Sequence, residues 1–184
     1  MKIYLDPGHG KSSKGYHGAN GNGIQEDIMN LEIAKKLNIL LKGNGHITHM
    51  SREDEKNISI ADRCLEANKL EYDIFLSIHC NSAENALAQG FESIYHPGSS
   101  KGKKLSDCIF NEVVKTTCKD HRSSRVDTRN LGVLVKTRMP AVVIECGFIS
   151  NIFEAHLIKQ GCYQWLICEG IANGIEEFIR NSEN

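Results

Sequence analysis

Three short apolar runs, each followed closely by ionisable residues, constrain the fold of this chain more than any other feature of its sequence. The runs are residues 2–5 (KIYL), 73–78 (DIFLSI) and 141–144 (AVVI). Each is too short for a helix and has the composition of a strand that is covered on both faces. Helical periodicity fills the segments between them, which is typical of parallel strands joined by helices. We therefore expect an α/β fold with a single domain, in which helices flank both faces of a twisted, mostly parallel β-sheet.

Weaker patterns assign the remaining elements. Apolar residues at helical spacing predict helices at residues 26–41, 58–70 and 103–117, and two more after residue 150 that are separated at Gly161. Shorter alternating or apolar runs predict further strands at residues 46–50, 91–95 and 131–135. The polar stretch 119–125 is expected to be a loop. Residues 8–23 hold six glycines, so this segment is expected to be either mobile or shaped closely around another group.

The length and composition fit one globular domain. At roughly 150 residues per domain, a chain of 184 residues leaves no room for a second domain of ordinary size. Apolar residues make up 40% and charged residues 24% of the chain, as in an ordinary soluble protein. We expect the domain to span residues 1–180 and residues 181–184 to form a frayed polar tail. The seven cysteines are an odd number without a C-x-x-C pair, which favours neither a disulfide framework nor a zinc knuckle.

Charge and hydropathy argue against several classes of partner. The chain has 22 Lys and Arg against 23 Asp and Glu and no basic stripe, so no nucleic-acid partner is expected. Only four residues of apolar character precede Asp6, which is too short for a secretory signal, and no run of about 18 apolar residues could span a membrane. We expect a protein without a signal peptide that is made in the cytoplasm and has no membrane partner. The sequence does not indicate an oligomeric state.

Ionisable residues follow all three buried runs. His9 comes shortly after the first run, His79 directly after the second and Glu145 directly after the third. The carboxyl ends of parallel strands meet at one edge of a sheet, where loops diverge and ligands bind. Two histidines and a carboxylate form a common catalytic zinc set that leaves one position open. Glu26, at the start of the first predicted helix, can reach the same edge, so either Glu26 or Glu145 can be the third ligand and the other can transfer protons.

Seven sequence motifs occur in the order typical of one enzyme family. They are DPGHG (6–10), a glutamate at 26, SREDE (51–55), R-x₃-AN (63–68), SIHCN (77–81), LGVL (131–134) and PAVVIECGFISN (140–151). Together they extend over about residues 1–179 and resemble the zinc-dependent N-acetylmuramoyl-L-alanine amidases of type 3. The sequence departs from the family pattern at Lys11, Ser51 and Cys80, where the family often has Gly, Thr and a small residue. None of these departures removes a candidate ligand.

The resemblance implies a zinc ion held by His9, Glu26 and His79, with Glu145 as the catalytic carboxylate. It also implies hydrolysis of the amide that joins the lactyl group of N-acetylmuramic acid to the L-alanine of a peptidoglycan stem. A zinc-activated water would attack, and Glu145 would act first as general base and then as general acid. The alternatives are a related zinc peptidase or deacetylase, and a non-catalytic wall-binding module. Without a signal peptide, the expected biology is that of a phage lysin that reaches the cell wall after release.

Other polar residues are expected to have structural roles. Cys80 and Cys146 directly follow candidate site residues, and the alternation of side chains along a strand turns both into the core. Asn151 is expected to cap a helix. Four basic residues can meet the carboxylates of a stem peptide or form surface ion pairs, of which the surface ion pair is the favoured interpretation: Arg52, Arg63, Arg129 and Lys136.

Overall fold

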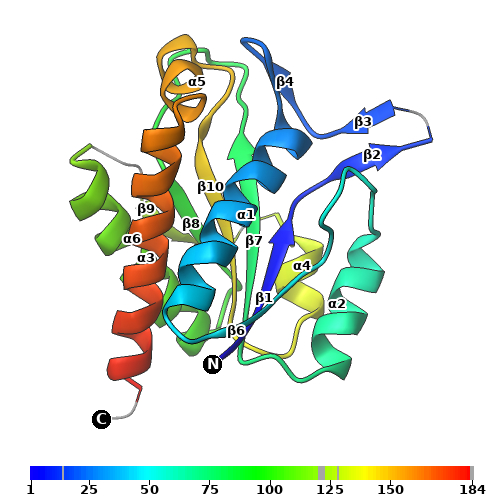
Figure 1. Ribbon diagram of the computed structural model, residues 1–184, viewed down its shortest axis with the longest axis vertical. Coiled ribbons are helices and arrows are strands. Elements are labelled where there is room, and N and C mark those ends of the chain that lie inside the picture. Colours follow the sequence, from blue (N-terminus) through cyan, green and yellow to red (C-terminus); the bar gives the residue numbers. More distant parts are fainter. Residues whose placement is uncertain (14, 120–122, 128, 183–184) are drawn as a thin grey trace.

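The computed structural model, which describes residues 1–13, 15–119, 123–127 and 129–182, is built around a six-stranded sheet (Figure 1). The strand order is β6-β1-β7-β10-β8-β9. The strands are β1 (Lys2–Pro7), β6 (Ile47–Met50), β7 (Ile74–Asn81), β8 (Glu92–Tyr95), β9 (Ser123–Val126) and β10 (Ala141–Phe148). All neighbouring strands are parallel except β8, which runs antiparallel to β10. The sheet is therefore mostly parallel, as the sequence predicted.

Helices cover both faces of the sheet. They are α1 (Glu26–Gly43), α2 (Ile60–Lys69), α3 (Ser100–Thr117), α4 (Gly132–Lys136), α5 (Ile152–Ile158) and α6 (Gly161–Arg180). Helices α1, α3 and α6 pack together on one face, and α2 lies beside α4 on the other (Figure 1). The expected α/β domain with helices on both faces is confirmed.

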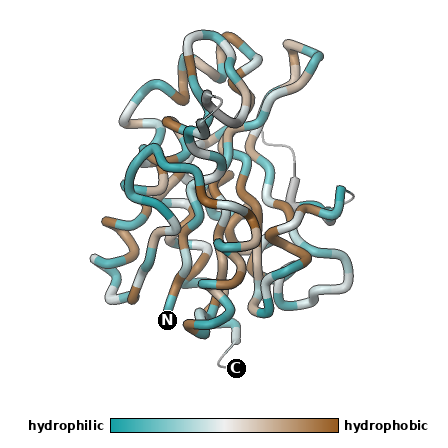
Figure 2. The backbone as a smooth tube through the Cα atoms, turned by 90° about the vertical axis from the view of Figure 1, so that its right-hand side faces the viewer, coloured by the Kyte–Doolittle hydropathy of each residue, from teal (hydrophilic) through white to brown (hydrophobic). Residues whose placement is uncertain are grey.

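Each face of the sheet has its own hydrophobic cluster, because side chains alternate along the strands. In β1, Ile3 and Leu5 belong to the cluster under α1, α3 and α6, whereas Tyr4 belongs to the cluster under α2 and α4. Figure 2 shows the same arrangement as apolar stretches through the middle of the molecule and hydrophilic stretches at many outer turns. Close contact between α3 and α6 depends on a small residue, since a Cβ at Gly174 would lie 2.4 Å from the Cα of Ile109.

Some of the helices, among them α2 and α5, begin with a short polar residue that caps the first turn. The Ser59 side chain accepts a hydrogen bond from the N–H of Asp62 at the start of α2. The Asn151 side chain accepts from the N–H groups of Phe153 and Glu154 at the start of α5, which confirms the predicted cap. These bonds satisfy backbone donors that the first turn of a helix leaves free.

Two element assignments from the sequence are wrong. Residues 131–135 were predicted as a strand, but Gly132–Lys136 form the short helix α4. The adjacent residues Val133 and Leu134 are both buried, as one turn of a helix allows, whereas a strand would turn them to opposite faces. The predicted loop at 119–125 contains part of β9, a polar edge strand that pairs with β8 through its backbone. Residues 120–122 of that stretch lie outside the described residues.

The glycine-rich segment 8–23 forms small sheets beside the carboxyl edge. Strands β2 (Gly10–Ser12) and β3 (Gly15–His17) pair antiparallel, and so do β4 (Asn20–Gly21) and β5 (Ile24–Gln25). Figure 1 shows β2, β3 and β4 beyond the carboxyl end of β1. The described residues of the segment therefore lie next to the edge where the candidate site residues were expected.

The cysteines are reduced, and most of them lie in the core. All seven cysteines are free, and five of them are buried. Cys80 and Cys146 lie in the core as strand alternation predicted, and burial raises the pKa of both thiols well above the ordinary value.

Among the described residues, none of the helices has the length and apolar character needed to cross a membrane. Helix α6 ends at Arg180, while the domain boundary placed there stays a prediction, and residues 183–184 of the expected tail lie outside the described residues.

Candidate metal centre

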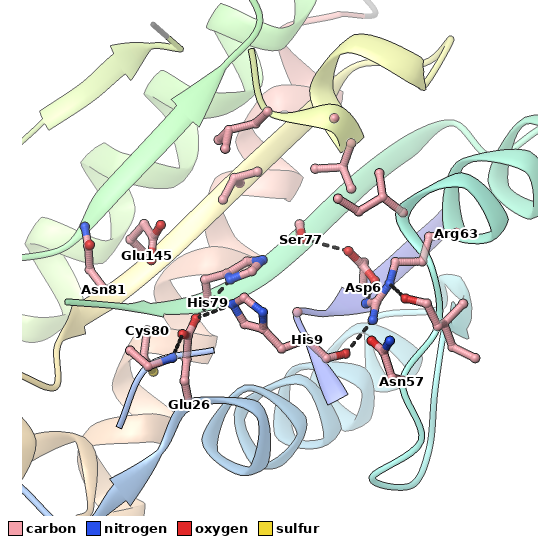
Figure 3. A pocket seen from close by; sticks show the side chains of 18 of the residues that line it. Asp6, His9, Glu26, Asn57, Arg63, Ser77, His79, Cys80, Asn81 and Glu145 are labelled. Atoms are coloured by element: carbon pink, nitrogen blue, oxygen red, sulfur yellow. Dashed lines mark hydrogen bonds and ion pairs between the residues drawn. The ribbon is translucent and has the colours of Figure 1, made fainter. Parts of the chain in front are cut away.

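Three side chains from distant parts of the chain converge at the carboxyl edge of the sheet (Figure 3). His9 follows β1, Glu26 is the first residue of α1, and His79 lies in β7. Glu26 Oε1 is 3.1 Å from His9 Nε2 and 3.0 Å from His79 Nδ1. One potential ligand atom from each residue lies within 4.8 Å of the others. The structure thus brings together three residues that the sequence analysis singled out, and their donors are those of a divalent-cation site.

Opposing charges hold this cluster together. Burial raises the pKa of the Glu26 carboxyl, but hydrogen bonds from His79 and His9, with their positive charge, hold it well below the ordinary value. Burial lowers the pKa of His79, but the hydrogen bond to Glu26 and the negative charge of Glu145 raise it above the ordinary value. A divalent cation would take the place of the imidazole protons and satisfy the same carboxylate.

Glycines let the backbone approach the cluster closely. A Cβ at Gly8 would lie 2.2 Å from Cε1 of His79, and one at Gly18 would lie 2.8 Å from Oε2 of Glu26. Gly18 also has a φ of +103°, which favours glycine. The next residue, Ala19, donates its backbone N–H to Glu26 Oε2 at 2.7 Å. The glycine-rich segment is therefore shaped around the candidate metal ligands.

Two buried arginines fix the backbone that carries His9. We call Arg52 and Arg63 the arginine clamp. Arg52 donates to the carbonyls of Pro7 and Gly8, each at 2.9 Å. Arg63 donates to the carbonyl of Pro7 at 2.8 Å and to that of His9. The interpretation of these arginines as surface ion pairs is wrong, because both side chains are buried and donate to three successive backbone carbonyls.

A buried carboxylate anchors the arginine clamp. Asp6, which is 1% exposed, pairs with Arg63 and accepts hydrogen bonds from the hydroxyls of Ser51 and Ser77, both at 2.7 Å. The clamp and this carboxylate hold His9 at a φ of 61°, a left-handed conformation that is uncommon for residues other than glycine. Sequence reasoning missed Asp6 as a site residue. The sequence feature that could have identified it is the position of this carboxylate directly after an apolar strand. A carboxylate at such a place is rarely buried without partners.

Glu145 faces the cluster from the neighbouring strand. It is paired in register with His79, is 7% exposed, and lies beside the three candidate ligands in Figure 3. Burial raises the pKa of its carboxyl above the ordinary value. Its Oε2 is buried and has no hydrogen-bond partner among the described residues. The other oxygen is 3.9 Å from Nη2 of Arg129. The site thus holds a carboxylate with one uncommitted oxygen.

The strands that carry these residues do not end where the sequence predicted. We expected β7 to end before His79 and β10 before Glu145, but β7 continues to Asn81 and β10 to Phe148. Pairing between the two strands resumes after a register shift between Glu145 and Phe148. Gly147, at a φ of +140°, lies in this bulge, and bulges often re-aim side chains beside functional sites.

A cavity of about 550 Å³ contains the cluster and Glu145. It lies between the sheet edge and two segments, residues 57–60 at the start of α2 and residues 129–133 leading into α4. Several side chains of these segments make that wall apolar: Ile58, Ile60, Leu131 and Val133. Among the described residues that line the cavity, Arg63 and Arg129 are the only Lys or Arg side chains. The cavity therefore places the polar candidate metal centre beside a largely apolar wall.

The fold and this site define an α/β protein with a candidate catalytic metal site in a cavity at the carboxyl edge of its sheet. The model of the N-acetylmuramoyl-L-alanine amidase family matches residues 3–177. The chain belongs to this family, and the predicted family, fold and amidase class are confirmed.

Individual relatives support the assignment over nearly the whole chain. The sporulation-specific N-acetylmuramoyl-L-alanine amidase of Bacillus subtilis (strain 168) is 35% identical over 96% of this chain and 68% of its own length. The endolysin of Bacillus phage SPP1 is 34% identical over 96% of this chain and 65% of its own length. The crystal structure of an N-acetylmuramoyl-L-alanine amidase from Clostridium difficile 630 has a TM-score of 0.89 and 33% identity, covering 97% of this chain and 96% of that one.

Proposed function

We propose that this protein is a zinc amidase that separates stem peptides from the glycan strands of peptidoglycan. The bond cleaved is the amide between the lactyl group of N-acetylmuramic acid and L-alanine. The proposal rests on one observation above all: three side chains that could hold a metal ion and a buried carboxylate with one uncommitted oxygen share one cavity in a member of the amidase family. Its place of action would be the bacterial cell wall, where this substrate occurs.

The chemistry of the donor set fits zinc. His9, Glu26 and His79 offer two imidazole nitrogens and one carboxylate oxygen, the three-ligand set of a catalytic zinc site with one open position. When bound, zinc supplies a Lewis acid that activates water at neutral pH and polarises a carbonyl. The Ala19 N–H orients the Glu26 carboxylate, and the arginine clamp fixes the backbone of His9. Such supporting bonds typically tune metal affinity.

Glu145 is the residue that we propose for proton transfer. Its Oε2 is free to accept a proton from the attacking water. The same oxygen would return that proton to the alanine nitrogen, because an amine leaves poorly as an anion. Burial raises the pKa of Glu145, which favours a carboxyl group that can hold the proton between the two steps. Water and the amide are thereby converted to a free lactyl carboxylic acid and a free amine.

Digestion of purified peptidoglycan tests this proposal against its alternatives. We expect the zinc-loaded protein to release new alanine α-amino groups without new reducing ends or acetate, as measured by mass spectrometry of the products. A peptidase would expose other amines, a deacetylase would release acetate, and a wall-binding module would release nothing. Any of these three results would contradict the proposed reaction.

The variant Glu145→Gln tests the proposed role of the carboxylate. It keeps the size of the side chain but cannot accept the proton, so we expect turnover to fall by about 10²- to 10⁴-fold. Zinc content by elemental analysis and the circular dichroism spectrum should match those of the wild type. Wild-type turnover in this variant would remove Glu145 from the mechanism.

A further inference from the structure

Arg129 presents a cation to the cavity, and its one ion pair among the described residues is a long contact with Glu145. Its side chain is about half exposed, at 49%, and its Nη2 lies 3.9 Å from Glu145 Oε1, too far for a hydrogen bond. Arg63, the other arginine of the cavity lining, is 3% exposed and is bonded to Asp6 and to backbone carbonyls. Of the two, Arg129 is therefore the one placed to meet a ligand.

The backbone around Arg129 is held in place. Asp127, which is 2% exposed, accepts hydrogen bonds from the N–H of Arg129 at 2.8 Å and from the N–H of Leu131 at 2.6 Å. The N–H of Asp127 donates to the carbonyl of Tyr95 in β8 at 2.7 Å. A buried carboxylate thus anchors the backbone N–H groups of Arg129 and Leu131, and this anchoring limits the entropy lost when Arg129 binds a ligand.

The charged residues of the cavity indicate whether the ligand of Arg129 is acidic or basic. The cavity lining contains the carboxylates Asp6, Glu26 and Glu145. Asp6 is paired with Arg63, and Glu26 is paired with the two histidines. Glu145 has only the 3.9 Å contact of its Oε1 with Arg129, and its Oε2 has no hydrogen-bond partner among the described residues. An acidic substrate that reacts beside Glu145 would be repelled unless a cation compensates its charge. Arg129 is placed to do so.

We propose that Arg129 determines substrate specificity by binding a free carboxylate on the stem-peptide residue that follows the alanine. This inference rests on the proposed function. An extended residue spans about 3.3–3.6 Å, and the guanidinium lies 3.9 Å from the carboxylate that acts on the scissile bond. The guanidinium of Arg129 can therefore reach the first one or two peptide residues, counted from the scissile bond. A guanidinium binds a carboxylate through two parallel hydrogen bonds, which an amide cannot accept in the same way.

A pair of matched substrates tests the proposal. The probes are the γ-methylamide of muramoyl-L-alanyl-D-glutamate, in which the α-carboxylate is the only free carboxylate of the peptide, and the γ-methylamide of muramoyl-L-alanyl-D-isoglutamine, in which that carboxylate is replaced by an amide. We expect the zinc-loaded wild type to prefer the acid by about tenfold in kcat/KM, as loss of one charge pair would predict. Arg129→Ala should lower kcat/KM for the acid only and so remove the preference. Lys136→Ala removes a charge from α4 outside the cavity lining and should leave the preference unchanged.

Binding without turnover provides a second measurement. We expect calorimetry with the γ-methylamides of the dipeptides L-alanyl-D-glutamate and L-alanyl-D-isoglutamine to show the same preference in the wild type, and Arg129→Ala to lose it. An equal loss of kcat/KM on both muramoyl substrates would overturn the proposal, because Arg129 would then act through Glu145 and not on the peptide. Equal affinity of the wild type for both dipeptides would also overturn it. If neither muramoyl substrate is cleaved, the proposed function fails, while the calorimetric comparison still tests Arg129.

Discussion

Glycine residues set how closely the backbone approaches the candidate ligands. Gly8 and Gly18 each lie where a methyl group would collide with one of them, and Gly18 also has a φ that other residues rarely adopt. The contact and the conformation are separate constraints. Gly15 has a similar φ of +116° but open space around it, so the two positions allow these constraints to be separated.

We expect Gly18→Ala to weaken zinc binding by about tenfold or more, since its Cβ would lie 2.8 Å from Glu26 Oε2 and 2.9 Å from His9 Cδ2. Gly15→Ala should incur a comparable backbone strain and keep wild-type zinc affinity. Competition with a chromophoric chelator measures both affinities. Equal affinities of the two variants would show that contact at Gly18 does not position the ligands.

At this scale, the sequence predicts the residues that carry chemistry better than those that support them. His9, Glu26, His79 and Glu145 could be singled out because they follow buried runs or begin a helix, and the structure gathers them at one edge. The arginine clamp could not, because whether an arginine is buried depends on which carbonyls the fold leaves without donors. The catalytic and ligand roles themselves await the experiments proposed above.

The arginine clamp connects elements that are distant in the sequence. Arg63 belongs to α2, and its guanidinium bonds the carbonyl of Pro7 at the end of β1 and that of His9 just beyond it. Its Nε also donates to the carbonyl of Ile58 before the helix, at 2.8 Å. The position of α2 is thus coupled to the conformation of His9.

We expect Arg63→Lys to fold but to bind zinc about 10- to 100-fold more weakly, because an ammonium keeps the charge beside Asp6 but cannot bond several carbonyls at once. Zinc affinity is measured by chelator competition, and folding by circular dichroism. Arg138→Lys, at an arginine that lines a separate cavity, is the matched control and should bind zinc normally. Wild-type affinity in Arg63→Lys would mean that the clamp serves stability alone.

Helices and strands with a clear pattern of apolar residues could be predicted from the sequence. Elements that depend on short length or on pairing with another strand could not. The three buried runs and the long helices follow from apolar periodicity. By contrast, α4 is only five residues long, too short for a helical period to be read from its sequence. Strand β9 is polar because it lies at the edge of the sheet, where backbone pairing with β8 alone identifies it. The bulge in β10 likewise depends on its pairing with β7.

For the whole molecule, the candidate metal centre lies at the edge of the sheet and outside its two hydrophobic clusters. The fold should therefore persist without the ion. Without it, the Glu26 carboxylate is still paired with His9 and His79 and is not left buried without a partner. We expect a chelator to abolish wall hydrolysis, zinc to restore it, and the far-UV circular dichroism spectrum to stay unchanged.

Zinc at about 100 times its Kd should stabilise the protein by about 2.7 kcal/mol, so removing it should lower the Tm by about 5–10 °C. Calorimetric scans with and without the chelator measure this change. Full activity after verified metal removal would contradict the proposed mechanism. Unfolding on metal removal would contradict the independence of the fold.

Both described ends of the chain lie at the amino edge of the sheet, opposite the cavity (Figure 1). Strand β1 starts at Lys2, and the last turn of α6 reaches the same region, where Glu176 contacts His46 and His46 lies 3.4 Å from the amino group of Met1. A bead or chip coupled at the amino edge would thus leave the carboxyl edge, with the candidate site, facing the solution. Immobilised in this way, the protein should still cleave insoluble sacculi. Such large particles can contact only the face of the protein that points away from the support.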